Sequence, residues 1–309
     1  MKHPIVDILL ARAARGSRAP HGDGARVALA VEGGAMRGVV SAGMLSALEG
    51  LGLTQAFDAV YGSSAGAFNS AYFLAGQVEY GTRIYSEDIN NLAFANMRRA
   101  FGSRPVVNVD LVLDVMTHQK ALDTARVLAT ETPFTILATD VTTAERVAFR
   151  SFSDRDDLLA ALRAGSTMPI LAGGPYAYRG RQYFDASLTE PIPLPIAEAD
   201  GFTHVLVLLT RPKGHHKTVS SLIERLLVTR PLRRLSPALA TKFEQRGRPY
   251  SALLAAIDGG HSPAGRSIVM GIRPEGDEVS KLERRRDVLL AAADSGRRAV
   301  MAAFQKLGN

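Results

Sequence analysis

A serine between two glycines is the feature of this sequence best suited to chemistry. Ser64 lies in the stretch 62–66 (Gly-Ser-Ser-Ala-Gly), after the apolar run 56–61 and before the small, then apolar run 65–74. This pattern is typical of a nucleophile elbow, in which a strand turns sharply into a helix and only small neighbours allow close packing. We therefore expect a serine hydroxyl exposed at the turn, faced by main-chain N–H groups of the helix start.

A second glycine-rich turn lies upstream at 32–38 (Glu-Gly-Gly-Ala-Met-Arg-Gly), between the apolar run 27–31 and the helix-like run 39–48. Small residues at the carboxyl end of a strand leave main-chain N–H groups uncovered. Such groups can stabilise an oxyanion that forms on a substrate bound at a neighbouring strand. Side by side, the two turns predict a site for acyl transfer.

Glycine-rich turns also bind phosphates, but neither nucleotide fingerprint fits this loop. A P-loop ends in Gly-Lys-Ser/Thr, whereas Val39 follows Gly38 here. The dinucleotide fingerprint requires a glycine where Ala35 stands. A lone Gly-x-Ser-x-Gly pattern also fits a plain strand-turn-helix junction, and only the upstream loop favours the catalytic interpretation.

Three ordered motifs resemble those of the patatin-like phospholipases, in particular the bacterial members of that family. They are the glycine-rich loop at 33–38, the serine elbow at 62–66 and Asp185, which small residues follow. The resemblance is firm over 26–212. It implies an α/β fold of three layers, α/β/α, with a mostly parallel central sheet, and a lipid acyl hydrolase with a catalytic dyad of Ser64 and Asp185.

The resemblance also implies which residues complete the site. Main-chain N–H groups near the serine would form the oxyanion hole, and further residues would support the two turns. The oxyanion hole would consist of Gly33, Gly34, Ala35 and Ala65, and the supporting residues would be Arg37, Gly38, Gly62 and Gly66. Arg37 has two interpretations: it attracts a phosphate head group, or it holds the loop through hydrogen bonds to carbonyl groups. We favour the second.

Two positions depart from the family pattern, because Ala35 and Ala186 stand where the family usually has glycine. If either position requires a positive φ, an alanine there costs on the order of 1 kcal/mol. This departure motivates an alternative function, a weakly active or non-catalytic module that binds lipid or a protein partner.

Histidine placement supports an aspartate as the base. None of the seven histidines stands in a local signature that would pair it with Ser64. Asp185 follows the run 181–184, and a carboxylate held against a serine hydroxyl can accept its proton if burial raises the pKa of the carboxylate. The implied reaction passes through an acyl-enzyme on Ser64 and requires no metal or cofactor; a thioesterase or acyltransferase would use the same site. Asp185 as an ordinary turn residue is the structural alternative.

Length and composition favour one catalytic domain with appendages. A chain of 309 residues buries roughly three-quarters of its surface on folding. We expect a flexible basic arm at 1–25, the catalytic domain at 26–212 and a mainly helical basic extension at 213–309 packed on it. Strands and helices alternate, which favours a parallel sheet covered on both faces. Beyond the two turns, the expected helices are 82–101 (with an irregular middle), 122–130 and 154–164, and the expected strands are 134–139, 147–149, 181–184 and 205–209.

Basic charge is concentrated in one segment. Residues 213–248 contain nine basic and two acidic residues, an excess of seven that equals the formal net charge of +7. An apolar stripe at 222–227 beside these arginines predicts an amphipathic helix that contacts an anionic membrane. The alternative is a helix that packs its leucines on the catalytic domain and leaves its arginines in water. We expect no nucleic acid, because no recognition motif accompanies the basic residues.

Cysteine usage and apolar run lengths indicate the compartment. The chain has no cysteine, which fits a reducing compartment. No apolar run is long enough to span a bilayer, and at the N-terminus the apolar run precedes the arginines, the reverse of a secretion signal. We expect a cytoplasmic protein, free or peripheral to the inner face of the membrane, whose substrate is a phospholipid or another fatty acyl ester.

Overall fold

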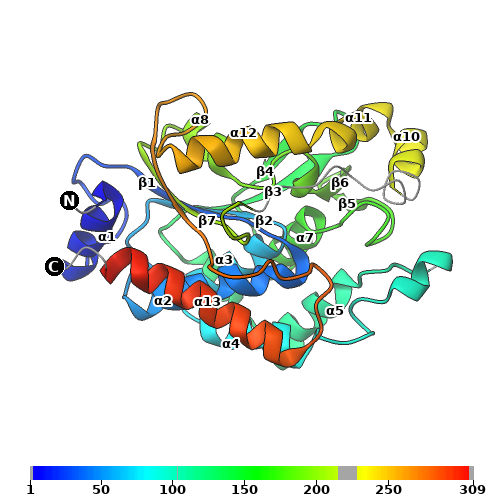
Figure 1. Cartoon of the computed structure of the whole chain (residues 1–309), viewed down its shortest axis with the longest axis horizontal. Helices are drawn as coiled ribbons and strands as arrows, with labels where there is room; N and C mark the ends of the chain where they lie inside the picture. Colours follow the sequence, from blue (N-terminus) through cyan, green and yellow to red (C-terminus); the bar gives the residue numbers. More distant parts are fainter. Residues whose placement is uncertain (1–2, 103, 215–227, 306–309) are drawn as a thin grey trace.

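The structure is a computed structural model that describes residues 3–102, 104–214 and 228–305. A central sheet lies between two layers of helices, as the sequence predicted (Figure 1). The strands run in the order β5-β6-β3-β2-β1-β7-β8, and β4 also pairs with β3. Their bounds are β1 Val27–Val31, β2 Ala59–Ser63, β3 Phe134–Asp140, β4 Arg146–Phe149, β5 Tyr176–Tyr178, β6 Arg181–Asp185, β7 His204–Leu208 and β8 Ile268–Ile272.

Most of the sheet is parallel. The strands β3, β2, β1, β7 and β8 are mutually parallel, whereas β4, β5 and β6 form an antiparallel edge. Parallel neighbours place the carboxyl ends of β1 and β2 at the same edge of the sheet, which is where ligands bind in open α/β sheets. The two glycine-rich turns follow these two strands, so this topology brings them together.

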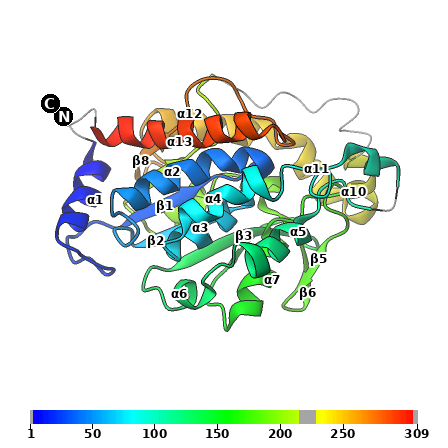
Figure 2. The same ribbon diagram turned by 90° about the horizontal axis from the view of Figure 1, so that it is seen from below.

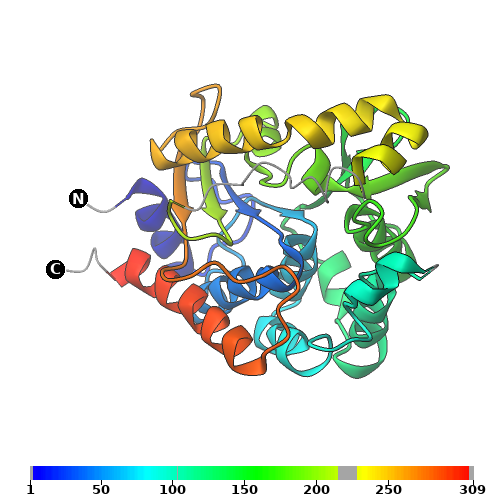
Figure 3. The same cartoon turned by 45° about the vertical axis from the view of Figure 1, so that its right-hand side comes forward.

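Helices cover both faces of the sheet (Figures 1 and 3). Side chains of β1 alternate between the faces: Leu29 and Val31 pack in the core beneath α2, while Ala28 and Ala30 pack beneath α8 and α12. This period of two is what a strand buried on both sides requires. The helices are α1 Pro4–Ala14, α2 Gly38–Gly50, α3 Ala65–Leu74, α4 Val78–Glu87, α5 Val109–Asp114, α6 Thr124–Leu128, α7 Arg155–Gly165, α8 Leu194–Ala199, α10 Arg230–Leu235, α11 Pro237–Gln245, α12 Gly247–Asp258 and α13 Arg286–Gln305.

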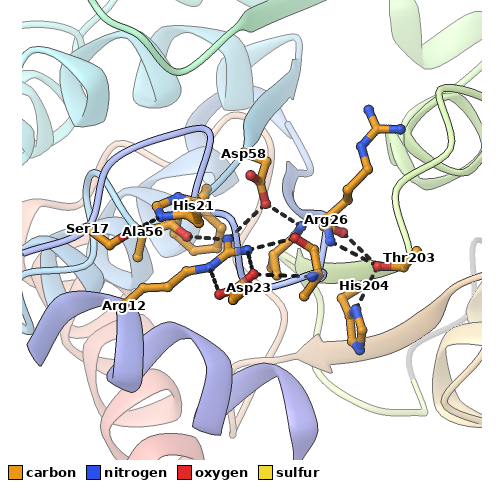
Figure 4. A network of polar contacts seen from close by, with 12 residues as sticks. Arg12, Ser17, His21, Asp23, Arg26, Ala56, Asp58, Thr203 and His204 are labelled. Atoms are coloured by element: carbon orange, nitrogen blue, oxygen red, sulfur yellow. Dashed lines mark hydrogen bonds and ion pairs between the residues drawn. The ribbon is translucent and has the colours of Figure 1, made fainter. Parts of the chain in front are cut away.

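The prediction of a flexible arm at 1–25 is wrong for residues 4–14, which form a packed helix. Residues 4–14 form α1, whose apolar face is fully buried, and Arg12 is 0% exposed. Its guanidinium donates to both carboxylate oxygens of Asp23 and to Asp58 at 2.8 Å, and to the carbonyl of Ala56 at 2.9 Å (Figure 4). The two carboxylates compensate the desolvation of the buried charge. Arg12, which the sequence placed in a flexible basic arm, therefore anchors the helix.

The C-terminal third is also more than a helical extension. The strand β8 pairs with β7 inside the central sheet, and α13 packs along α2 (Figure 2). The segment 213–309 therefore completes both the sheet and one helical layer. The predicted apolar stripe at 222–227 lies outside the described residues.

Other predicted elements lie close to their expected positions, with one exception. The expected helix at 82–101 is α4, which ends at Glu87, followed by irregular chain and the 3₁₀ helix η2, Met97–Phe101. Within the described ranges, no helix is both long enough and apolar enough to cross a bilayer.

Candidate active site

Ser64 occupies a strained turn between β2 and α3. Its backbone has φ 54° and ψ −130°, a conformation that non-glycine residues rarely adopt. The flanking glycines allow it: a Cβ on Gly62 would lie 2.4 Å from the Cα of Ala67, and one on Gly66 would lie 2.4 Å from the carbonyl oxygen of Val31. The surrounding packing therefore holds the serine in the geometry of a nucleophile elbow.

The loop after β1 lies against this turn. A Cβ on Gly33 would lie 2.7 Å from the Cβ of Ser64 and 3.0 Å from the main-chain nitrogen of Ala65. In the described part of the chain, the main-chain N–H groups of Gly33, Gly34, Ala35 and Ala65 donate to no other protein group. These four donors therefore remain available to a ligand beside Ser64.

The two alanines that replace glycine differ in backbone conformation. Ala35 has φ 52°, in the left-handed region, so the strain expected of an alanine is present there. Ala186 begins the 3₁₀ helix η4, Ala186–Leu188, without a positive φ. Only the substitution in the glycine-rich loop has a conformational cost.

Buried polar residues hold the loop in place. Glu32 is 3% exposed; its carboxylate accepts from the main chain of Thr210 at 2.7 Å and from the Tyr250 hydroxyl at 2.7 Å. Behind the loop, the carbonyl of Gly38 accepts from the Asn69 amide at 2.8 Å. These bonds tie the loop to β7, α12 and α3, so its shape depends on three separate elements.

Arg37 is buried with its guanidinium engaged. It donates to the Thr210 hydroxyl at 3.1 Å and to Glu278 at 2.5 Å. Burial lowers the pKa of Arg37, and the nearby carboxylates of Glu32 and Glu278 oppose that shift. These contacts favour the interpretation in which Arg37 holds the loop, with side-chain partners rather than the expected carbonyl groups.

Asp185 lies two strands from the serine. Ser63 is in register with Leu137 on β3, and Ala138, the next residue on β3, is in register with Asp185 on β6. Adjacent strands are about 5 Å apart, so the main chains of Ser64 and Asp185 are about 10 Å apart at a similar height in the sheet. Side chains that point toward each other can bridge most of that gap.

The Asp185 carboxylate is fully buried and only half satisfied. It is 0% exposed, and Oδ1 accepts from the main chain of Ser187 at 2.7 Å. Oδ2 accepts no hydrogen bond from any described residue, and none joins it to Ser64. Buried carboxylate oxygens are normally paired, and catalytic hydrogen bonds often tighten only when substrate is bound.

The described histidines lie away from this site. Each bonds to a nearby residue in sequence: His3 caps α1, His21 contacts Ser17, His118 contacts Asp114, His204 contacts Thr203 and His261 contacts Ser262. His215 and His216 lie outside the described residues.

Ser64 lines two cavities of different character. One encloses about 560 Å³ of empty space and is mainly apolar, with Phe68, Ile84, Phe94, Val112 and Met116 among its lining residues. The other encloses about 410 Å³ and is polar, with Arg37, Ser187, Arg211, Tyr250 and Lys281 in its wall. An ester with a fatty acyl chain on one side and a polar group on the other fits this arrangement.

Sequence reasoning missed the polar wall. Arg211 follows β7 at the carboxyl edge of the sheet and donates to Glu278 at 2.7 Å, while its guanidinium lies 5.3 Å from the ring centroid of Tyr250. Its position just after a predicted strand was a usable signal. Glu278 and Lys281 belong to an irregular segment without any motif, and only the tertiary fold brings them to the site.

The fold and the site together define a patatin-type α/β protein, and a comparison with family models agrees. The model described as patatin-like phospholipase matches residues 29–198, which is more than half of the chain. The chain therefore belongs to the patatin-like phospholipase family.

Individual relatives are more distant. The uncharacterized protein YjjU of Escherichia coli is 26% identical over 196 residues, 62% of this chain and 54% of the relative, so the chain spans about half the length of that curated protein. Among solved structures, VipD from Legionella pneumophila aligns over 91% of this chain and 67% of its own, with TM-score 0.50 and 11% identity. Human GIVD cytosolic phospholipase A2 aligns over 97% and 63%, with TM-score 0.43 and 13% identity. At such identities the structural likeness concerns the fold alone.

Proposed function

We propose that this protein is a lipid acyl hydrolase that cleaves carboxylic esters through Ser64 and Asp185. One observation carries the proposal. The strained serine lines both an apolar cavity and a polar one, next to main-chain N–H groups that no group of the described residues uses. Membership of the patatin-like phospholipase family supports the same class of activity.

The geometry supports a two-step mechanism. Ser64 Oγ attacks the ester carbonyl carbon, its proton passes to Asp185 Oδ2, and the uncommitted N–H groups of the loop stabilise the oxyanion. The tetrahedral intermediate then collapses: the bond to the alkoxy oxygen breaks, and the alcohol leaves with the proton from Asp185. In the second step Asp185 takes a proton from water, whose oxygen attacks the acyl carbonyl carbon. The bond from that carbon to Ser64 Oγ then breaks, Oγ takes the proton back from Asp185, and the fatty acid leaves.

Ser64→Ala tests the nucleophile. We expect hydrolysis of a short-chain nitrophenyl ester to fall below about one per cent of wild type, because no nucleophile remains at the elbow. Labelling by an organophosphonate that reacts with activated serines should disappear as well. The matched control is Ser63→Ala, which removes the neighbouring hydroxyl and should keep most of the activity. Retained turnover in Ser64→Ala would place the nucleophile elsewhere. If the wild-type protein is neither labelled nor active, a non-catalytic binding module is favoured.

Asp185→Asn tests the base. We expect kcat to fall by several orders of magnitude, because the amide cannot accept the serine proton. Single replacement of the seven histidines by glutamine serves as the control and should leave kcat within a few-fold of wild type. If one histidine variant is as inactive as Asp185→Asn, the proposed dyad is contradicted and a catalytic triad that includes this histidine is favoured.

Peripheral contact with an anionic membrane is part of the proposal. Arg230, Arg233 and Arg234 lie on α10, and Leu232 of the same helix is buried in one apolar cluster with Phe184 and Leu188, which flank Asp185 in sequence. A basic helix joined to the Asp185 region by this cluster would hold the enzyme at a lipid surface that contains its substrate.

A further inference from the structure

The irregular segment before α13 passes over the glycine-rich loop. The carbonyl oxygen of Lys281 accepts a hydrogen bond from the main chain of Met36 at 3.2 Å. The Lys281 side chain lines the polar cavity together with Ser64 and Ala35. A cation from the last third of the chain therefore lies in the wall of the cavity that contains the proposed nucleophile.

Lys281 differs from the other cations of this wall because it has no partner among the described residues. Arg37 and Arg211 both donate to one carboxylate oxygen of Glu278, at 2.5 and 2.7 Å. The ammonium of Lys281 makes no hydrogen bond or ion pair with any residue in the described ranges. A cation without a counterion in a polar cavity favours an anionic ligand.

The electrostatic surroundings of Lys281 agree with this assignment. The side chain is exposed to water in the cavity, yet the protein packed around the cavity lowers its pKa to about 8. Loss of bulk solvation is the largest cause, repulsion from the neighbouring arginines adds to it, and attraction by Asp185 opposes it. Among the described residues, the charged and titratable groups around Lys281 are Arg37, Arg211, Arg246, Asp185, Glu32, Glu278 and Tyr250.

We propose that Lys281 binds the phosphate of a phospholipid substrate, on the opposite side of Ser64 from the acyl chain. This inference rests on the proposed function. An ester carbonyl at Ser64 has two substituents: the acyl chain enters the apolar cavity, so the alkoxy side extends into the polar one. In a phospholipid the phosphate is attached to that side. Lys281 is then a specificity residue for phospholipids over neutral esters.

Two monomeric substrates isolate this role. We compare kcat/KM for dihexanoyl phosphatidylglycerol with kcat/KM for a hexanoyl nitrophenyl ester, which has no phosphate. In Lys281→Gln the ratio of the two should fall about 10- to 100-fold, the effect of losing a hydrogen bond to a charged group. Lys281→Arg should recover most of the ratio. Arg284→Gln is the control, because it removes a charge three residues away that does not line the polar cavity.

The pH dependence adds a readout that a merely structural role would not change. Lys281 is charged below its pKa, so the wild-type ratio should be high below about pH 8 and fall as the pH rises through that value. In Lys281→Arg the ratio should stay high at alkaline pH, and in Lys281→Gln it should be low and flat. A fall of the ratio with rising pH that persists unchanged in Lys281→Gln would contradict the proposal.

Binding to inactive protein separates this inference from the proposed function. Calorimetry on Ser64→Ala should show dihexanoyl phosphatidylglycerol bound about 10- to 100-fold more tightly than by the double variant Ser64→Ala/Lys281→Gln. This difference in affinity is expected even if wild type hydrolyses no ester. Absence of hydrolysis would refute the proposed hydrolase activity but not the role of Lys281. Equal affinities, or an unchanged substrate ratio in Lys281→Gln, would overturn the role of Lys281.

Discussion

At the residue scale, the site combines two left-handed residues that are not glycine. Ser64 with φ 54° and Ala35 with φ 52° lie on adjacent turns. Such conformations persist only where the surrounding structure imposes them, and they cluster at functional sites. The glycines packed against both turns show how the fold imposes them here.

Ala35→Gly tests the strain in the loop. Glycine adopts φ 52° freely, whereas an L-residue there costs roughly 1–2 kcal/mol. Glycine also increases the conformational entropy of the unfolded chain, which lowers stability by roughly 0.4–1 kcal/mol. We therefore expect the free energy of unfolding to rise by up to about 1.5 kcal/mol, measured by denaturant titration. Ala186→Gly is the matched control; without a positive φ to relieve, it should lower stability, and a similar loss in Ala35→Gly would refute the strain.

At the element scale, two glycines set the distance between α2 and α13. A Cβ on Gly43 of α2 would lie 2.0 Å from the carbonyl oxygen of Ala293, and one on Gly296 of α13 would lie 2.2 Å from that of Val40. The two backbones are therefore in direct contact. Since α2 begins at the end of the glycine-rich loop, this contact also positions the loop.

Gly296→Ala should destabilise the protein although alanine is the better helix former. The added methyl must displace a backbone, which costs about 1–3 kcal/mol, against a gain of about 1 kcal/mol in helix propensity. Gly50→Ala in α2 is the control, because a Cβ there meets no atom within 4 Å; it should raise the free energy of unfolding. Thermal and denaturant unfolding measure the stability of both variants. If Gly296→Ala stabilises the protein as Gly50→Ala does, the two helices can move apart to accept the methyl group.

At the scale of the whole molecule, the basic helix α10 and the helix α1 lie at opposite ends (Figures 1 and 2). Leu235, at the end of α10, is 46% exposed and accompanies the arginines of that helix. This placement would orient the protein with one end toward a membrane.

Joint replacement of Arg230, Arg233 and Arg234 by glutamine should weaken binding to anionic vesicles. Each basic residue near such a surface contributes about 1 kcal/mol, and the exposed pairing of Arg233 with Glu244 reduces its share. We expect a loss on the order of 10- to 100-fold in co-sedimentation, and weaker wild-type binding as salt rises. Hydrolysis of a soluble ester should persist.

The control replaces Arg15 and Arg18, which follow α1, and Arg298, which lies on α13. It removes the same charge away from α10 and should keep vesicle binding close to wild type. Equal losses in both triple variants would mean that net charge alone governs binding, and no loss in either would leave α10 as a packed helix with a solvated face.

The sequence alone determined the fold class, the family and the two turns with their small residues. Local chemistry explains this success. Glycines that permit close packing, and apolar runs of strand or helix period, act over a few residues and can be recognised without knowledge of distant contacts. The sheet around the site, β1, β2, β3 and β7, was therefore predictable within a few residues.

Only the tertiary structure decided what depends on distant partners. The burial of Arg12 requires Asp23 and Asp58, and the strand β8 joins the sheet only because β7 offers an edge. Likewise, the loop that contains Ala35 is closed by Lys281, almost 250 residues later in the chain. No local pattern specifies such contacts, because their energy arises from desolvation and pairing between segments that meet only in the folded chain.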